Sequence, residues 1–323
     1  MITRLVKLIV IIIAYATIIY PQDYPHIKKA YIKCYVTHPT EDSLYYYNYT
    51  LRNDSTSTGD IFYFEIDISL NPPVLSDTSG LKYRFDFERS DFNETYQGKQ
   101  GTLVPVGFWC PEDWDGSISY LLVAEISGFP QIKPGAIKSG FQINAKAIPS
   151  IRKVTISPAE DYIIDKMPSI EDTVNSLTDQ QIDSIKTACK YQTWTIGPHL
   201  FPKDYPFSAI IDSIKSYTKR SAMLGWIVDK KDDDKEKHDK EKEKGSEIVK
   251  ELMKYLDKAR EQLVKNKIKE AKKKLEEFVE KVKENYHEND KDEEKEKSEH
   301  SYLTSEAYAL LKYNAEYLIR QLK

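Results

Sequence analysis

The chain has 323 residues, of which 40% are hydrophobic and 30% are charged, and this length and composition suit two domains with buried cores. The formal net charge of −4 is close to balance, which excludes a strong electrostatic attraction to nucleic acid. Tyrosine is unusually frequent, with 23 residues, and such a large amphipathic side chain suits half-buried strands and interfaces.

The first segment has the pattern of a secretory signal peptide. Arg4 and Lys7 give it a positive start, an apolar run follows, and Ala14-Tyr15-Ala16 offers small residues where a signal peptidase reads them. The apolar run is shorter than the roughly 20 residues of a spanning helix, which favours cleavage after Ala16 over an uncleaved anchor. We therefore expect residues 1–16 to be removed on export to the periplasm, cell surface or medium, leaving no membrane span in the mature chain.

The three cysteines are Cys34, Cys110 and Cys189. An odd number in an exported chain leaves at least one thiol unpaired or intermolecular. Cys34 and Cys110 are the expected pair if one forms, and three buried free thiols is an equally supported alternative. No histidine or cysteine has the spacing of a metal site, so we predict neither a metal nor a cofactor.

Residues 22–157 are predicted to form an all-β sandwich. The clearest strand is 61–69, where Phe62, Phe64, Ile66 and Ile68 alternate with polar residues. Asp115-Gly116 and Pro134-Gly135 are predicted turns. The predicted strands are 31–36, 44–51, 61–69, 81–88, 103–108, 117–125, 140–147 and 152–157.

Residues 158–228 are predicted to connect the domains, with helical character in two places. Ile185 and Cys189 share one helical face, and Ile210, Ile214 and Tyr217 form an apolar stripe on a second helix. The following segment, 229–245, is almost purely charged, so we predict a solvated linker.

The last segment, 246–323, is predicted to be an antiparallel three-helix unit. Apolar residues recur at helical spacing within 248–263, 268–282 and 307–319, and Thr304 is the expected N-cap of the last helix. A polar insert separates the second helix from the third. The sequence thus predicts a multidomain protein, an all-β sandwich followed by an α-helical module.

Several motifs in this last segment resemble the FIMAH domain, a small helical module of exported bacterial proteins. The resemblance rests on the residues Leu256-x-x-Ala259, Ala271-x-x-x-Leu275-x-x-Phe278-Val279-x-x-Val282, Leu303-Thr304-Ser305-Glu306-Ala307-Tyr308-Ala309-Leu310-Leu311 and Tyr317-Leu318-Ile319. Thr195-Ile196-Gly197-Pro198 and Leu224-Gly225-Trp226-Ile227 resemble a lead-in found in such proteins. The resemblance implies an accessory module in a bacterial surface or secreted protein, and it implies no catalytic residues.

The chain departs from that family pattern at two places. Lys265-Asn266-Lys267 stands where the family has a Gly-Asn turn, and the insert at 287–300 is long and charged. In the β-rich part, Trp114-Asp115-Gly116, Ile118-Ser119-Tyr120 and Ser139-Gly140-Phe141 resemble a pattern of uncharacterised exported β-sandwiches, which implies no activity.

Acidic residues give two candidate sites, each with a simpler explanation. Glu65 and Asp67 share one strand face, and a pair of carboxylates can catalyse glycoside hydrolysis. An exposed polar strand face is the favoured interpretation. Glu112, Asp113 and Asp115 are close enough to bind Ca²⁺, but the spacing lacks an ordered ligand pattern and favours an acidic turn.

Trp109, Trp114 and Tyr120 are the candidate ligand contacts. Exposed aromatic rings on a sheet provide a stacking platform for a sugar, while burial in the core is the commoner fate of tryptophan. No nucleophile elbow, zinc-protease motif or phosphate loop occurs in the sequence.

We therefore expect an exported, non-enzymatic surface or envelope protein that binds a glycan or another envelope protein. A secreted hydrolase and a passive structural component are the alternatives.

Overall fold

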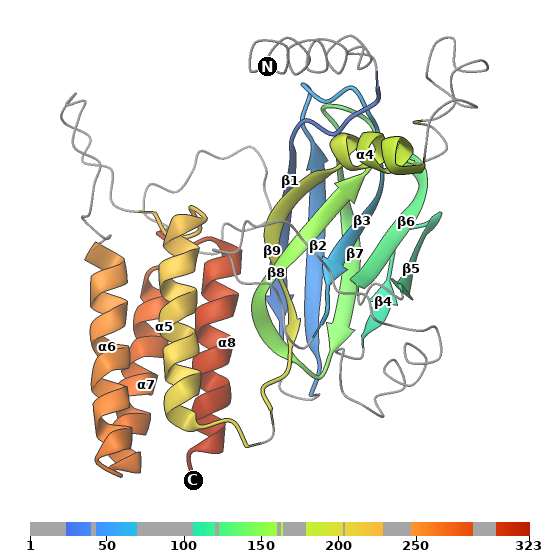
Figure 1. Cartoon of the computed structure of the whole chain (residues 1–323). Coiled ribbons are helices and arrows are strands. Elements are labelled where there is room, and N and C mark those ends of the chain that lie inside the picture. The colour runs from blue at the N-terminus through green and yellow to red at the C-terminus, as the bar shows by residue number, and fades with distance from the viewer. Residues whose placement is uncertain are drawn as a thin grey trace, which may run out of the picture.

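The computed structural model shows a β-rich body and a bundle of helices beside it (Figure 1). It describes residues 24–39, 43–69, 106–119, 123–159, 163, 179–202, 204–228, 247–286 and 302–323. The β-rich part precedes most of the helices along the chain, as the sequence predicted.

Nine described strands form two antiparallel sheets. One sheet has the order β1-β2-β7-β4, with β1 (Ala30–Thr37), β2 (Tyr45–Asn53), β7 (Ile137–Ala145) and β4 (Gly107–Trp109). The other has the order β5-β6-β3-β8-β9, with β5 (Trp114–Ser119), β6 (Val123–Ile132), β3 (Ile61–Asp67), β8 (Ile148–Ser157) and β9 (Tyr191–His199).

Alternation of apolar side chains explains how the sheets meet. In β2 every second residue from Tyr45 to Asn53 is buried, which places its tyrosines on the inner face. Aromatic rings from both sheets touch in the core, with Phe64 5.2 Å from Phe141 and Trp114 5.0 Å from Phe141 between ring centroids. The Tyr49 hydroxyl also donates to the Ile196 carbonyl across the two sheets at 3.0 Å.

Two details of the predicted strand pattern were wrong. The expected strand at 117–125 is two antiparallel strands, β5 and β6, in which Asp115 pairs with Ser127. Asp115-Gly116 therefore lies inside β5, because the turn that precedes this strand falls earlier, at Asp113, whose φ is +66°. Pro134-Gly135 does form a turn, with Gly135 at a φ of +82°.

Asp67 is also buried, whereas the sequence suggested an exposed polar strand face. Arg152 on β8 has an exposed fraction of 0%, and its Nη1 atom lies 3.9 Å from Asp67 Oδ1. The guanidinium also donates to the carbonyls of Ser69 and Pro198. A buried arginine needs an opposite charge and hydrogen-bond acceptors close by. The charge of Arg152 therefore accounts for the burial of Asp67.

Five described helices follow or interrupt the strands: α4 (Asp179–Cys189), α5 (Phe207–Met223), α6 (Glu247–Val264), α7 (Ile268–Glu284) and α8 (Ser305–Gln321). Helices α5 to α8 contact one another as a bundle, in which α5 touches α6 and α8, and α7 touches the same two helices. The expected three-helix count therefore omits α5, whose apolar stripe of Ile210, Ile214 and Tyr217 joins this bundle.

The segment predicted to connect the two parts contributes to both. Strand β9 pairs with β8 along its length, from Ile148 with His199 to Ile156 with Tyr191. One continuous cluster of buried apolar residues runs from the sheets into the helices. The sheets and the helices consequently share a hydrophobic core.

Helix α8 lies against the sheets (Figure 1) and contacts β1, β8 and β9. Glu306, with an exposed fraction of 5%, accepts a hydrogen bond from the Cys34 backbone N–H at 2.7 Å. The Tyr313 hydroxyl donates to the Val36 carbonyl at 3.2 Å. These groups of β1 point away from β2, so α8 satisfies the free edge of this strand.

Several predicted features lie outside the described residues. These are the signal peptide at 1–16, the strand at 81–88, the charged linker at 229–245 and the insert at 287–300. Within the described part of the chain, no helix combines the length and apolarity that crossing a bilayer requires.

The turn between α6 and α7 provides a first test. Asn266 has a φ of +55°, Lys267 N–H donates to the Gln262 carbonyl, and Asn266 N–H donates to the Leu263 carbonyl. This is the helix ending in which glycine is preferred at the left-handed position. We expect Asn266→Gly to raise the free energy of unfolding by about 0.5 kcal/mol and Asn266→Ala to lower it by about 1 kcal/mol. Urea denaturation measures both, and Lys267→Gly, at a φ of −95°, is the control that should destabilise.

The contact between α8 and β1 provides a second test. Glu306→Ala leaves the buried Cys34 N–H without its acceptor, so we expect a loss of about 1–3 kcal/mol in the free energy of unfolding. Glu306→Gln keeps an acceptor oxygen and should cost less. Glu270→Ala is the matched control, because Glu270 is also in a first helical turn but is exposed. Equal losses for Glu306→Ala and Glu270→Ala, measured by urea denaturation, would contradict this account of the edge.

Candidate functional site

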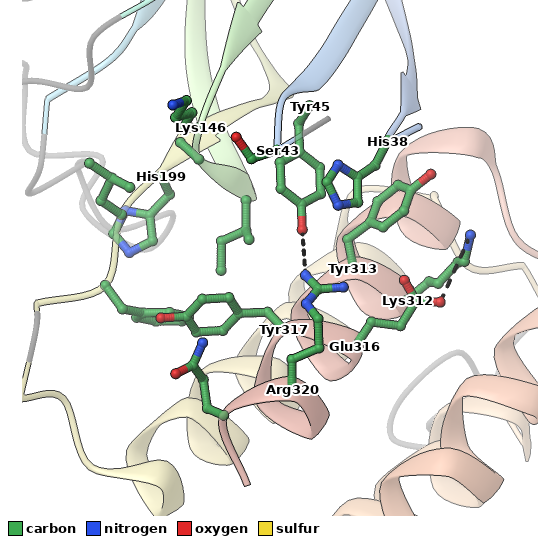
Figure 2. A pocket seen from close by; sticks show the side chains of 15 residues that line it. His38, Ser43, Tyr45, Lys146, His199, Lys312, Tyr313, Glu316, Tyr317 and Arg320 are labelled. Carbon is green, nitrogen blue, oxygen red and sulfur yellow. Dashed lines mark hydrogen bonds and ion pairs between the residues drawn. The ribbon is translucent and has the colours of Figure 1, made fainter. Parts of the chain in front are cut away.

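A cavity of about 710 Å³ lies between the strand ends and the C-terminal half of α8. It is lined by His38, Ser43, Tyr45, Lys146, Ala147, Ile148, His199, Leu200, Phe201, Lys312, Tyr313, Glu316, Tyr317, Arg320 and Gln321 (Figure 2). The residues from α8 recur at a spacing of four, which places them on one helix face. The other walls come from the end of β1, the start of β2, the β7–β8 turn and the end of β9.

One wall is a fixed stack of rings. His38 stacks on Tyr45 with the ring planes 8° apart and the centroids 4.0 Å apart. His38 Nδ1 lies 2.8 Å from the Leu44 carbonyl, and Tyr313 meets Tyr45 edge-on at 5.4 Å. With rings packed on it from two directions, Tyr45 has little freedom to change its position.

Arg320 reaches from α8 to this wall. Its Nη2 donates to the Tyr45 hydroxyl at 2.9 Å, and Figure 2 shows the guanidinium directed toward the phenol. Burial raises the pKa of Tyr45, although the charge of Arg320 acts in the opposite direction. A neutral phenol that accepts from Arg320 still has its own O–H to donate.

Lys312 and Glu316 form a pair on the same helix. Lys312 Nζ lies 4.0 Å from Glu316 Oε1 and 4.5 Å from the centroid of the Tyr313 ring. The charge of Lys312 is therefore partly balanced within α8, by a carboxylate and by the face of an aromatic ring.

A second group of rings lies on the opposite side of the cavity. Phe201 stacks on Tyr205 at 5.1 Å, tilts against Tyr317 at 5.9 Å and meets His199 edge-on at 5.1 Å. The lining thus combines planar apolar surfaces with a small number of polar and charged groups, which is typical of a small-molecule site.

His199 is held neutral at this position. Burial and the nearby charge of Arg152 lower the pKa of His199 from 6.5 to about 3. Its buried Nδ1 atom has no hydrogen-bond partner among the described residues. Among the described residues, no nucleophile or acid lies beside this neutral imidazole. His199 therefore contributes an unpaired polar atom, Nδ1, to the cavity wall.

Of the sequence-predicted ligand contacts, Trp109 and Trp114 do not line this cavity. Trp109 is 60% exposed on β4, whereas Trp114 is 6% exposed and its Nε1 donates to the Pro130 carbonyl at 3.3 Å. Tyr120 lies outside the described residues. Because Trp114 packs in the core against Phe141, it provides no exposed stacking face.

The structure also shows the positions of the candidate carboxylates of β3 and of the three cysteines. Glu65 is in β3 opposite Glu125 of β6, and Asp67 is paired with Arg152. Cys34, Cys110 and Cys189 are all free thiols, so the possible Cys34–Cys110 disulfide is not formed. Over the described ranges, no group of three or more potential metal ligands comes together.

Sequence reasoning missed the cavity because its walls come from separated segments. His38, Lys146, His199 and Arg320 have no local motif in common, and only the fold brings them together. One sequence feature could have pointed to the cavity. Helix α8 carries three tyrosines, Tyr308, Tyr313 and Tyr317, among its apolar residues. No known family model matches the chain, and no curated protein is significantly similar to it.

The neutral state of His199 leads to a prediction about pH. The folded state binds fewer protons than the unfolded state between pH 6.5 and about 3, so His199 contributes stability above pH 6.5 that is lost as the pH falls. We expect wild type to lose about 2 kcal/mol more free energy of unfolding than His199→Gln between pH 7 and 4.5. Urea denaturation at each pH measures the difference, and parallel pH profiles would refute the assignment.

Proposed function

We propose that this protein is an exported, non-enzymatic component of a bacterial surface or envelope that binds a glycan in the cavity beside α8. The observation that carries the proposal is the lining itself, where ring faces from Tyr317 and Phe201 share a cavity with the polar ends of Tyr45, Ser43 and Arg320. A sugar offers the matching surfaces, because its C–H faces lie against aromatic rings while its hydroxyls exchange hydrogen bonds.

Within this proposal, the two sheets are a β-sandwich and the helices after 246 are a FIMAH-like module. The quoted family positions support this, since Leu256, Leu275, Phe278 and Leu310 are all buried. Thr304 also caps α8, with its side chain accepting from the Ala307 N–H. The module then has two roles, because it supplies one wall of the cavity and covers the edge of β1.

The lead-in residues of that resemblance support the same interpretation. A Cβ atom added at Gly197 would lie 3.1 Å from Arg152 Cγ, and the Pro198 carbonyl accepts two hydrogen bonds from Arg152. Gly225 has a φ of +71° where α5 ends, and Thr304 N–H donates to the Trp226 carbonyl. These short motifs therefore have structural reasons to be present.

A binding role is preferred to hydrolysis for a chemical reason. Glycoside hydrolysis ordinarily uses two carboxyl groups about 5–9.5 Å apart. The described lining includes one carboxylate, Glu316, which is engaged by Lys312. Binding by contrast requires only complementary surfaces.

A glycan array tests the proposal with residues 17–323, which is the chain after the expected cleavage. We expect the wild type to retain at least one class of glycan and Tyr317→Ala to reduce that binding about tenfold or more. Tyr31→Ala is the control, because Tyr31 is an exposed tyrosine on the outer face of β1. Absence of all glycan binding by a folded protein would refute the proposal, and turnover of a glycan would favour the hydrolase alternative.

A further inference from the structure

The cationic groups of the cavity differ in how far they are already neutralised. Lys312 is 4.0 Å from Glu316 and also faces the Tyr313 ring, so much of its charge is balanced internally. Arg320 has one described polar contact, the neutral Tyr45 hydroxyl, and no described carboxylate lies within 4.0 Å of it. Lys146 is exposed and belongs to no described ion pair. The lining therefore has positive charge in excess.

Arg320 is exposed, and its hydrogen bond to Tyr45 positions the guanidinium. Its partner Tyr45 contacts the stacked His38 ring and the Tyr313 ring, whose plane is 80° from its own. The guanidinium also presents five N–H donors, and the bond to Tyr45 uses one of them. The donors that remain are arranged as a fork, the geometry that suits the two oxygens of a carboxylate.

Two features of the surroundings reduce the advantage of a doubly charged ligand. The cavity lies beside the C-terminal half of α8, where the helix dipole is negative. Glu316 adds a full negative charge to the same lining. A phosphate near pH 7 carries more charge than a carboxylate, so it is opposed more strongly by both features.

The aromatic surface lies in the same cavity as the cation. Tyr317 is three residues before Arg320 on α8. Arg320 is directed toward Tyr45, while Tyr317 extends across the cavity, where its ring lies 5.9 Å from that of Phe201 (Figure 2). Phe201, stacked on Tyr205, extends this apolar surface to the end of β9. One ligand ring lying on this surface would thus have the guanidinium of Arg320 at its edge.

We propose that the cavity binds an acidic saccharide, with the carboxylate of a uronic acid at Arg320 and the sugar ring against Tyr317. This inference rests on the proposed glycan-binding function and narrows it to one chemical class. Tyr45 donates its O–H to a ring hydroxyl or to the carboxylate, and Lys146 adds a second positive charge at the rim.

Isothermal titration calorimetry of residues 17–323 with two matched sugars tests this class. The acidic probe is a galacturonic acid trisaccharide, and the neutral probe is the same trisaccharide with its carboxyl groups reduced to alcohols. We expect the neutral probe to bind about 10- to 100-fold more weakly than the acidic probe, because it lacks the charge-assisted hydrogen bonds. Equal affinity for the two probes would overturn the acidic assignment.

Variants locate the effect in the cavity. We expect Arg320→Met to weaken binding of the acidic probe by about 10- to 100-fold and to leave binding of the neutral probe almost unchanged. Tyr317→Ala should weaken the binding of both probes. Arg52→Met is the matched control, because Arg52 is an exposed arginine of β2 that does not line the cavity. Thermal melting of each variant shows whether it is folded.

The outcomes separate this inference from the proposed function. If a neutral glycan binds and Tyr317→Ala abolishes that binding while Arg320→Met does not, the acidic class is wrong and glycan binding stands. If acidic sugars bind but Arg320→Met and Tyr317→Ala have no effect, the cavity assignment is wrong. Tighter binding of a sugar phosphate than of the uronate would overturn the preference for a single charge.

Discussion

Much of this structure depends on the free edge of β1. An edge strand presents backbone N–H and C=O groups that must find partners once they are covered. Helix α8 provides these partners from its side chains, with Glu306 at the Cys34 N–H and Tyr313 at the Val36 carbonyl. Asn314 adds a bond to the Pro149 carbonyl on the neighbouring sheet. The helix thereby joins the open side of both sheets, and the bundle is held to the β-rich part through it.

This role explains the composition of α8. Helices α6 and α7 bury one apolar stripe and expose many charges, as a helix with one partner surface does. Helix α8 is instead buried on most of its surface, because α5 and α7 contact it on one side and β1 and β8 on the other. Polar residues such as Glu306 and Asn314 are acceptable there since each has a specific backbone partner. The continuous core from sheets to helices is the energetic result.

Local patterns predicted the elements better than their assembly. The alternation in β2, the turn at Pro134-Gly135 and the cap at Thr304 all depend on neighbouring residues, so the sequence reveals them. The pairing of β9 with β8 and the burial of Asp67 depend on partners far along the chain. Trp109 and Trp114 flank the same acidic segment, and the sequence gives no reason to treat them differently. In the structure, Trp109 is exposed and Trp114 is packed against Phe141. The cavity was beyond such reasoning, because its lining is assembled from separate segments spread between His38 and Gln321.

The docking of α8 and the properties of the cavity are physically coupled. The N-terminal half of the helix is held by Glu306 and its middle by Tyr313, and the last turns carry Tyr317 and Arg320. A ligand that contacts α8 and the strand ends together binds only when the helix is docked, so its binding free energy adds to the stability of the docked state. Conversely, the edge contacts pre-organise the cavity, because they place Arg320 against Tyr45 before any ligand arrives. The covering of an edge strand and the shaping of a binding site are in this way consequences of the same helix position.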